Sequence, residues 1–211
     1  QVTSLVSLQI ANLTSKQVSA LTTNDLEVMS AARLQALSTS AITGLTTTQV
    51  AALDSAQLSG LSTAQLASFT TAQLVAIDTS DIDNLTTSQI VGLSSAQVVA
   101  LTTTQMGAMT TQQISAIESS DFGVFTTAQI VALNTAQTAN LVTAQVAALS
   151  SDQLTALETR DLVVMTTAQL QALTTTAMAG LTTTQVAAMD SAQLSGLLTT
   201  QLASFTTAQL V

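Results

Sequence analysis

Carboxylates are the side chains of this sequence that could do chemistry, and most of them gather in four octapeptides. These octapeptides, TTNDLEVM, DTSDIDNL, ESSDFGVF and ETRDLVVM, begin at residues 22, 78, 118 and 158. Asp78, Asp81 and Asp83 lie closest together, and carboxylate oxygens are ligands that Ca²⁺ prefers. No EF-hand loop or glycine-rich calcium nonapeptide surrounds them. We therefore favour a second interpretation, in which such an Asp stabilises a helix N-terminus, and we predict no metal site.

Other catalytic chemistry has no foundation in this composition. The chain contains no His and no Cys, so the usual nucleophile–base pairs, zinc sites and haem ligands cannot be assembled. The lack of Cys also excludes disulfides and leaves the redox compartment open. The sequence predicts no catalytic residue, no cofactor and no enzymatic activity.

The charge balance excludes nucleic acid as a partner. Only Lys16, Arg33 and Arg160 are basic, against twelve acidic residues, which gives a net charge of -9. Nucleic-acid binding needs Lys and Arg to neutralise phosphates. A membrane span needs about 20 mostly apolar residues, whereas Thr, Ser or Gln interrupts every repeat here, so no span is predicted. No signal peptide is visible at the N-terminus.

One octapeptide pattern covers the whole chain, and TTAQLVAI at residues 70–77 fills its positions one to eight. Position eight is Leu, Met, Ile or Phe in all 26 occurrences, and position five is apolar in 26 of 27, with Thr138 the exception. Position four is Gln in 20 of 27. No insertion or deletion breaks this frame, which loops of an ordinary domain would do. We expect residues 1–211 to form a single continuous array, cut from a longer one because Gln1 and Val211 lie in mid-repeat.

The period of eight predicts a helix that restarts in every octapeptide, hereafter octad. In one strand, positions five and eight would face opposite sides; in one long helix, the apolar stripe would drift about 80° per octad. Position one is mostly Ser, Thr, Asp or Asn, the N-cap residues, and Gln three residues later completes a capping box. Position eight of one octad and position five of the next, such as Phe69 and Leu74, form the hydrophobic staple.

Helices confined to positions two to seven are too short to be stable alone. Their stability must come from stacking on neighbouring octads. The predicted fold class is therefore all-α: a solenoid, or superhelix, of short capped helices, one per octad, with positions five and eight facing its interior.

Two further columns leave alternatives open. Position seven holds small residues, and its glycines permit either close approach or a sharp turn at the helix end; they are Gly44, Gly60, Gly92, Gly180 and Gly196. Position two is Ser or Thr almost throughout, as at Thr71. Its hydroxyl either bonds the backbone of an adjacent coil or belongs to an ordinary first-turn residue.

A longer period lies above the octad. The segment that starts at residue 46 returns almost unchanged at residue 182, a shift of 17 octads, and the acidic octads follow at intervals of seven, five and five. The odd intervals indicate equivalent octads related by screw symmetry. From these intervals we predict roughly five to six octads per superhelical turn, which would place the acidic octads near one side.

The TTAQ-[LIV]-x-[AG]-L octads resemble the repeat arrays of very long bacterial secreted or surface proteins, which are described as adhesin-like. The resemblance covers the whole chain. It implies an extracellular or cell-surface location and a structural role, without naming a ligand.

The sequence thus predicts a non-enzymatic element that forms an extracellular fibre, stalk or sheath on a bacterial surface. Copies would assemble head to tail, since an open heterologous contact generates filaments, and apolar position-six residues would permit lateral contacts. One alternative is a recognition module whose Thr rows bind a glycan, a cell surface or ice. A functional amyloid and an intracellular scaffold are two others.

Overall fold

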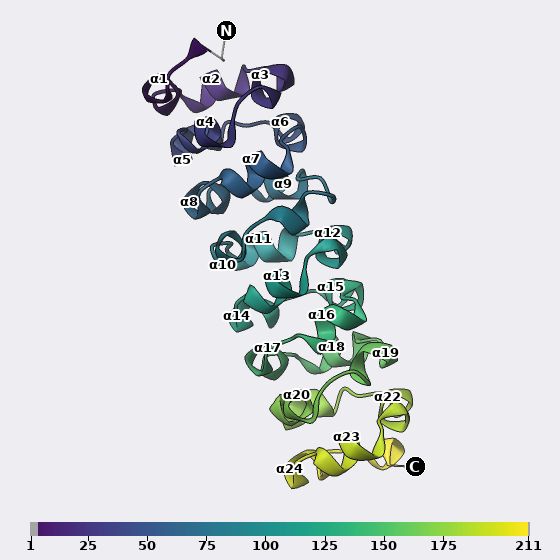
Figure 1. Ribbon diagram of the computed structural model, residues 1–211. Coiled ribbons are helices and arrows are strands. Elements are labelled where there is room, and N and C mark those ends of the chain that lie inside the picture. Colours follow the sequence, from purple (N-terminus) through teal and green to yellow (C-terminus); the bar gives the residue numbers. More distant parts are fainter. Residues whose placement is uncertain (1–3, 211) are drawn as a thin grey trace. The chain divides into compact units, whose positions relative to one another are not determined.

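The computed structural model describes residues 4–210, and within that range it is helical without any strand. The chain divides into two compact units, residues 1–108 and residues 109–211. In each unit, every octad contributes one short helix, and successive helices follow one another as layers (Figure 1). This confirms the predicted all-α solenoid of one helix per octad.

The first unit contains twelve α-helices and one 3₁₀ helix, η2, in its described part. The helices are α1 (Ser7–Ala11), α2 (Ser15–Ser19), α3 (Thr23–Glu27), α4 (Ala31–Gln35), α5 (Thr39–Ile42), α6 (Thr47–Ala51), α7 (Ser55–Gly60), α8 (Thr63–Ala67), α9 (Thr71–Val75), η2 (Ile82–Asn84), α10 (Thr87–Val91), α11 (Ser95–Ala100) and α12 (Thr103–Ala108).

The second unit continues in the same frame, with a 3₁₀ helix, η3, in its last described octad. Its helices are α13 (Thr111–Ala116), α14 (Ser119–Phe122), α15 (Thr127–Ala132), α16 (Thr135–Ala139), α17 (Thr143–Ala147), α18 (Ser151–Ala156), α19 (Thr159–Leu162), α20 (Thr167–Ala172), α21 (Thr175–Met178), α22 (Thr183–Ala188), α23 (Ser191–Gly196), α24 (Thr199–Leu202) and η3 (Thr207–Gln209).

The predicted capping box explains where the helices begin. At α9, the Thr70 hydroxyl oxygen accepts a hydrogen bond from the Gln73 backbone N–H at 3.2 Å. The Gln73 Oε1 in turn accepts from the Thr70 backbone N–H at 2.7 Å. Thr70 itself is extended, with φ -67° and ψ 158°, so the helix starts at position two. Two of the N–H groups that a helix start leaves without intrahelical partners are thereby satisfied.

The octad that begins at Asp78 departs from this geometry. Asp78 Oδ1 accepts from the backbone N–H of Ser80 at 2.9 Å and from the Ser80 hydroxyl at 2.8 Å. An Asp side chain bonded two residues ahead forms an Asx turn, which competes with the helix N-cap. The octad therefore forms a turn and then η2 instead of an α-helix. The same two bonds, the backbone one first, lower the pKa of Asp78.

Positions five and eight form the core, as predicted. Leu74 and Ile77 in the first unit and Leu154 and Leu157 in the second are all buried. Position-six residues such as Val131 are exposed instead. Each short helix thus buries one edge and leaves the other in solvent.

Contacts between helices recur at intervals of three octads. In the first unit α4 contacts α7 and α6 contacts α9, and in the second α15 contacts α18 and α17 contacts α20. The glutamine bonds described below span four octads, so one superhelical turn holds between three and four. The predicted five to six octads per turn is wrong. It assumed that acidic octads share one side, but an interval of five octads is not a whole number of such turns.

The glycines of position seven serve close approach. None of the glycines described has a positive φ, so no sharp turn requires them. A Cβ at Gly180 would lie far inside van der Waals contact with the Ser151 carbonyl oxygen, and Gly44 meets Ser15 in the same way. In each pair the serine lies three octads earlier, so glycine lets two helices of successive turns touch through their backbones.

The Gly180→Ala substitution should therefore destabilise the second unit by about 1–3 kcal/mol, the usual cost of overpacking. This loss would occur although Ala is the better helix former. Gly123→Ala is the matched control, because its Cβ would stand 3.2 Å from the Ala148 carbonyl oxygen and needs only a small shift. Urea unfolding of both variants measures the difference. If the two variants are equally stable, the close-approach explanation is wrong.

Thr138 is the one polar residue at position five, and it is fully buried. Its hydroxyl has no hydrogen-bond partner among the residues described. A buried polar group without a partner costs about 1–3 kcal/mol. The apolar column therefore contains one local defect in the second unit.

Replacing Thr138 by Val should raise the free energy of unfolding by about 1–2 kcal/mol, since shape is kept and the unpaired hydroxyl is removed. The reciprocal control is Val146→Thr in the next octad, which is also fully buried and should lose a similar amount. Thermal unfolding of the two variants checks both signs. A destabilised Val variant would mean that the hydroxyl is bonded in solution.

Candidate functional site

The glutamine at position four connects two turns of the solenoid. Gln145 is fully buried, and its Oε1 accepts from the Val142 backbone N–H at 3.1 Å. Its Nε2 donates to the carbonyl oxygens of Ile114 at 2.7 Å and Ile117 at 2.8 Å. One end of the side-chain amide therefore caps its own helix, and the other end reaches the octad four positions earlier.

This geometry recurs through both units. The bond from Gln Nε2 to the carbonyl oxygen 28 residues earlier is made by Gln49, Gln57, Gln65, Gln73, Gln89, Gln97 and Gln105, and by Gln137, Gln145, Gln153, Gln169, Gln185, Gln193, Gln201 and Gln209. We call these residues the glutamine ladder. All of them are buried.

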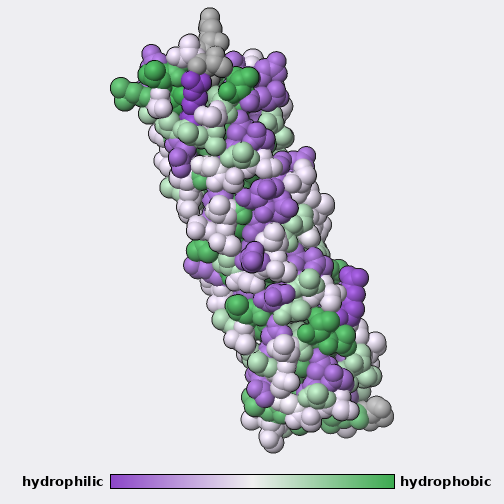
Figure 2. Space-filling view, in the orientation of Figure 1, coloured by the Kyte–Doolittle hydropathy of each residue, from purple (hydrophilic) through white to green (hydrophobic). Residues whose placement is uncertain are grey.

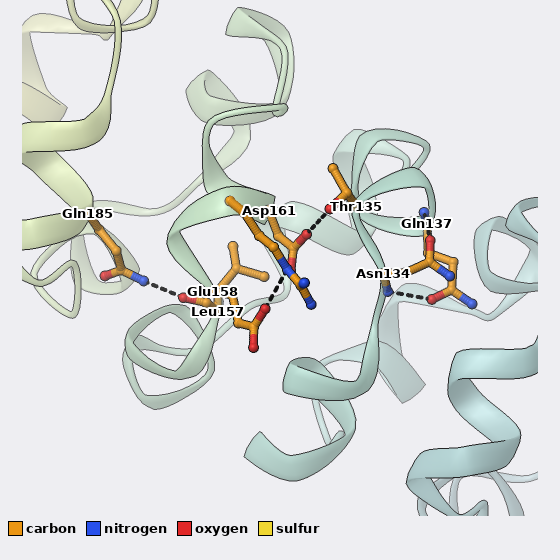
Figure 3. A network of polar contacts seen from close by, with 8 residues as sticks. Asn134, Thr135, Gln137, Leu157, Glu158, Asp161 and Gln185 are labelled. Atoms are coloured by element: carbon orange, nitrogen blue, oxygen red, sulfur yellow. Dashed lines mark hydrogen bonds and ion pairs between the residues drawn. The ribbon is translucent and has the colours of Figure 1, made fainter.

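The ladder solves the hydrogen-bonding problem of very short helices. A helix leaves its first N–H groups and last C=O groups without intrahelical partners, and in a helix of four to six residues these are most of the backbone. Gln185 illustrates the solution in Figure 3: its Nε2 donates to the Leu157 carbonyl oxygen at 2.6 Å, while its Oε1 accepts from the Thr182 N–H at 2.7 Å. Since buried polar groups without partners are costly, these amides stabilise the stack.

Sequence reasoning found only the capping end of this side chain. A capping box accepts Glu as readily as Gln, yet no Glu occupies position four anywhere in the chain. Glu can accept the N-cap hydrogen bond but cannot donate to a carbonyl. The exclusive use of Gln over Glu was therefore the available sign of a second, donating contact.

The acidic octads use position four differently. Asp161 is fully buried, and its Oδ1 accepts from the Thr135 hydroxyl at 2.7 Å (Figure 3). The Arg160 Nε lies 3.8 Å from the Asp161 Oδ2 and forms an ion pair with Glu158. In the first unit, Asp81 accepts from the hydroxyl of a position-two serine, Ser55, in the equivalent manner.

These contacts refine two predictions. The donor hydroxyls, Ser55 and Thr135, occupy position two three octads earlier, so the predicted bond to an adjacent coil exists there, but its acceptor is a carboxylate. Thr71 is an exposed first-turn residue, which fits the other alternative. The predicted N-terminal role holds at Asp25, whose Oδ2 accepts from the Thr22 hydroxyl at 2.7 Å and backbone N–H at 3.0 Å. These two bonds, the side-chain one first, lower the pKa of Asp25.

The carboxylates considered for calcium are each engaged within the protein. Asp78 bonds Ser80, Asp81 bonds Ser55, and the Asp83 Oδ1 accepts from its neighbour Asn84 at 2.6 Å. Across residues 4–210, no group of three or more acidic, His or Cys side chains is arranged to hold a metal ion. The acidic octads therefore offer hydrogen-bond acceptors between turns.

The surface of the helices offers little chemistry. On the face in Figure 2, polar and apolar side chains are interspersed. A shallow hollow of about 300 Å³ in the second unit is lined by Thr111, Gln112, Ser115, Ala116 and Asn140, none of them charged. No helix in the described range has the length and apolar character needed to cross a membrane.

The geometry defines the class: an all-helical octad-repeat solenoid whose turns are joined by buried side-chain amides. The chain belongs to the ALTTAQ repeat family, which matches residues 18–55, 50–79, 74–111, 114–151 and 154–191. The family's name reproduces the octad as it reads from position eight to position four. No curated protein matches the chain.

Proposed function

We propose that this chain is a non-enzymatic structural element that builds an extended extracellular fibre, stalk or sheath on a bacterial surface. The observation that supports it most is the glutamine ladder. Each octad is joined to the octad four positions earlier by the same pair of bonds, as at Gln145 and Gln185. A contact that uses only residues present in every octad can be repeated without limit, which suits a linear assembly.

The polar side chains also support a structural role. The Gln amides of the ladder are occupied by backbone groups, and Asp81 and Asp161 accept hydroxyl bonds between turns. Catalysis needs unlike groups that converge on a reacting atom and remain available to it. Here the same groups hold octads together.

Electron microscopy of the purified chain tests the proposal. We expect regular filaments, with a helical repeat that corresponds to three to four octads per turn. Monodisperse short particles that bind one soluble ligand stoichiometrically would overturn the fibre. Antibody labelling of intact cells that produce the chain tests the extracellular location, and labelling only after lysis would contradict it.

A second function has an observation of its own. The position-two residues Thr63, Thr71, Thr87 and Thr103 are exposed, so rows of hydroxyl and methyl groups are open to solvent. Such rows suit recognition of a glycan or of ice. Thermal hysteresis and glycan-binding measurements decide this alternative, which is rejected if both are negative for well-folded protein.

A further inference from the structure

The same sequence occurs twice in this chain, in two different surroundings. Residues 46–75 and 182–211 differ only in the pairs Leu53/Met189, Ser62/Leu198 and Ala64/Thr200. The first copy lies within the first unit and the second copy within the second. The pair therefore shows what covers this segment in one place and is missing in the other.

In the first copy, the position-five leucines are covered by later octads. Leu66 and Leu74 are fully buried. Gln105, four octads after the octad of Leu74, donates to the Leu74 carbonyl at 3.1 Å and the Ile77 carbonyl at 3.0 Å. The occupant of this face is thus another set of octads with position-four glutamines.

In the second copy, the equivalent leucines are open to solvent. Leu202, the equivalent of Leu66, is 39% exposed, and Leu210, the equivalent of Leu74, is 63% exposed. With Val186, Leu194 and Phe205 they line an apolar hollow of roughly 630 Å³. Hollows of this size, with few polar groups, are favourable sites for apolar side chains.

The direction of the glutamine bonds gives each layer a polarity. Ladder glutamines donate to earlier octads, so a layer offers amide donors toward earlier octads and carbonyl acceptors toward later ones. In the first unit, Gln9 and Gln17 are exposed and make their capping bonds at Val6 and Thr14. Their Nε2 atoms make no hydrogen bond to any residue in the range 4–210. Leu8, beside them, is 75% exposed.

We propose that a second copy of this chain covers the hollow at Leu202 with its first octads, α1 and α2. The inference rests on the proposed fibre and specifies its interface. Gln9 and Gln17 of one copy donate to position-five and position-eight carbonyls of the other, and Leu8 adds apolar contact. Because donors face acceptors only in one orientation, the contact is head to tail. It is heterologous, and repetition gives a filament.

Two arginine substitutions at equally exposed sites test this interface. Leu202 and Val163 are both 39% exposed, but Leu202 lines the hollow and Val163 lies on the side of its octad at position six. Leu202→Arg should weaken self-association about a hundredfold, since an unpaired charge is costly in an apolar contact. Val163→Arg should leave it unchanged. Sedimentation over a concentration series measures both, and far-UV circular dichroism verifies that both variants are folded.

A mixing experiment tests the polarity of the contact. A chain with Gln9→Glu and Gln17→Glu keeps an intact hollow, whereas the Leu202→Arg chain keeps intact first octads. Each chain alone should remain monomeric, and the mixture should form one-to-one complexes that do not grow. Failure of the mixture to form dimers overturns the head-to-tail contact.

The outcomes separate this interface from the fibre itself. Filaments that persist in Leu202→Arg and disappear in Val163→Arg would reject the end contact in favour of a lateral one, and leave the fibre proposal standing. A parent chain that forms no filament at any concentration would reject both.

Discussion

Substituting Gln145 by Glu should destabilise the second unit by about 3–5 kcal/mol at pH 7, the cost of leaving a buried charge without a partner. Glu still accepts the Val142 N–H, so the helix cap is retained. It cannot donate to the carbonyls of Ile114 and Ile117, and its charge would face their oxygens. Urea unfolding measures the loss.

The loss should depend on pH with a definite sign. Burial raises the pKa of the introduced carboxyl above its unfolded value of about 4.3. The folded state then binds the proton more tightly than the unfolded state, so the variant recovers stability as the pH falls through its raised folded pKa. A protonated Glu can also donate one bond. The gap between parent and variant should therefore narrow between pH 7 and pH 4.

Gln17→Glu is the control for this prediction. Gln17 makes the capping bond to Thr14 but is exposed. A carboxylate at a helix N-terminus is tolerated or slightly favourable, so its effect should stay within about 0.5 kcal/mol. Equal losses at Gln17 and Gln145 would show that the inter-turn bonds contribute nothing.

Replacing Leu101 by Ala should cost about 2–5 kcal/mol, the range for deletion of a buried leucine side chain. Leu101 is 3% exposed at position eight, where it both ends α11 and precedes α12. Val131→Ala, at position six and 42% exposed, should cost far less. Chemical denaturation of the two variants compares the columns. Losses of equal size would refute the assignment of position eight to the core.

Local features of the fold could be predicted because their causes lie within nine consecutive residues. The N-cap of Thr70, the capping Gln73 and the staple of Phe69 with Leu74 all depend on spacing in one octad and its neighbour. Since no octad is inserted or shortened, one local solution applies to the whole chain. Helix type failed only where Asp78 formed an Asx turn, a competition that composition does not settle.

Contacts between turns could not be predicted in the same way. The number of octads per turn depends on how side chains pack across roughly 30 residues, and no single octad records it. The intervals between acidic octads were a poor guide, because Asp81 and Asp161 make local bonds between turns and do not share one side by design. Gly180 showed its meaning only once Ser151 was seen beside it.

The measurement that tests the glutamine ladder most directly is nuclear magnetic resonance of the Gln145 side-chain amide in the folded protein. We predict nuclear Overhauser contacts from its Nε2 protons to Ile114 and Ile117, and slow exchange of these protons with solvent. Contacts confined to its own octad, with exchange as fast as that of the exposed Gln17, would contradict the account.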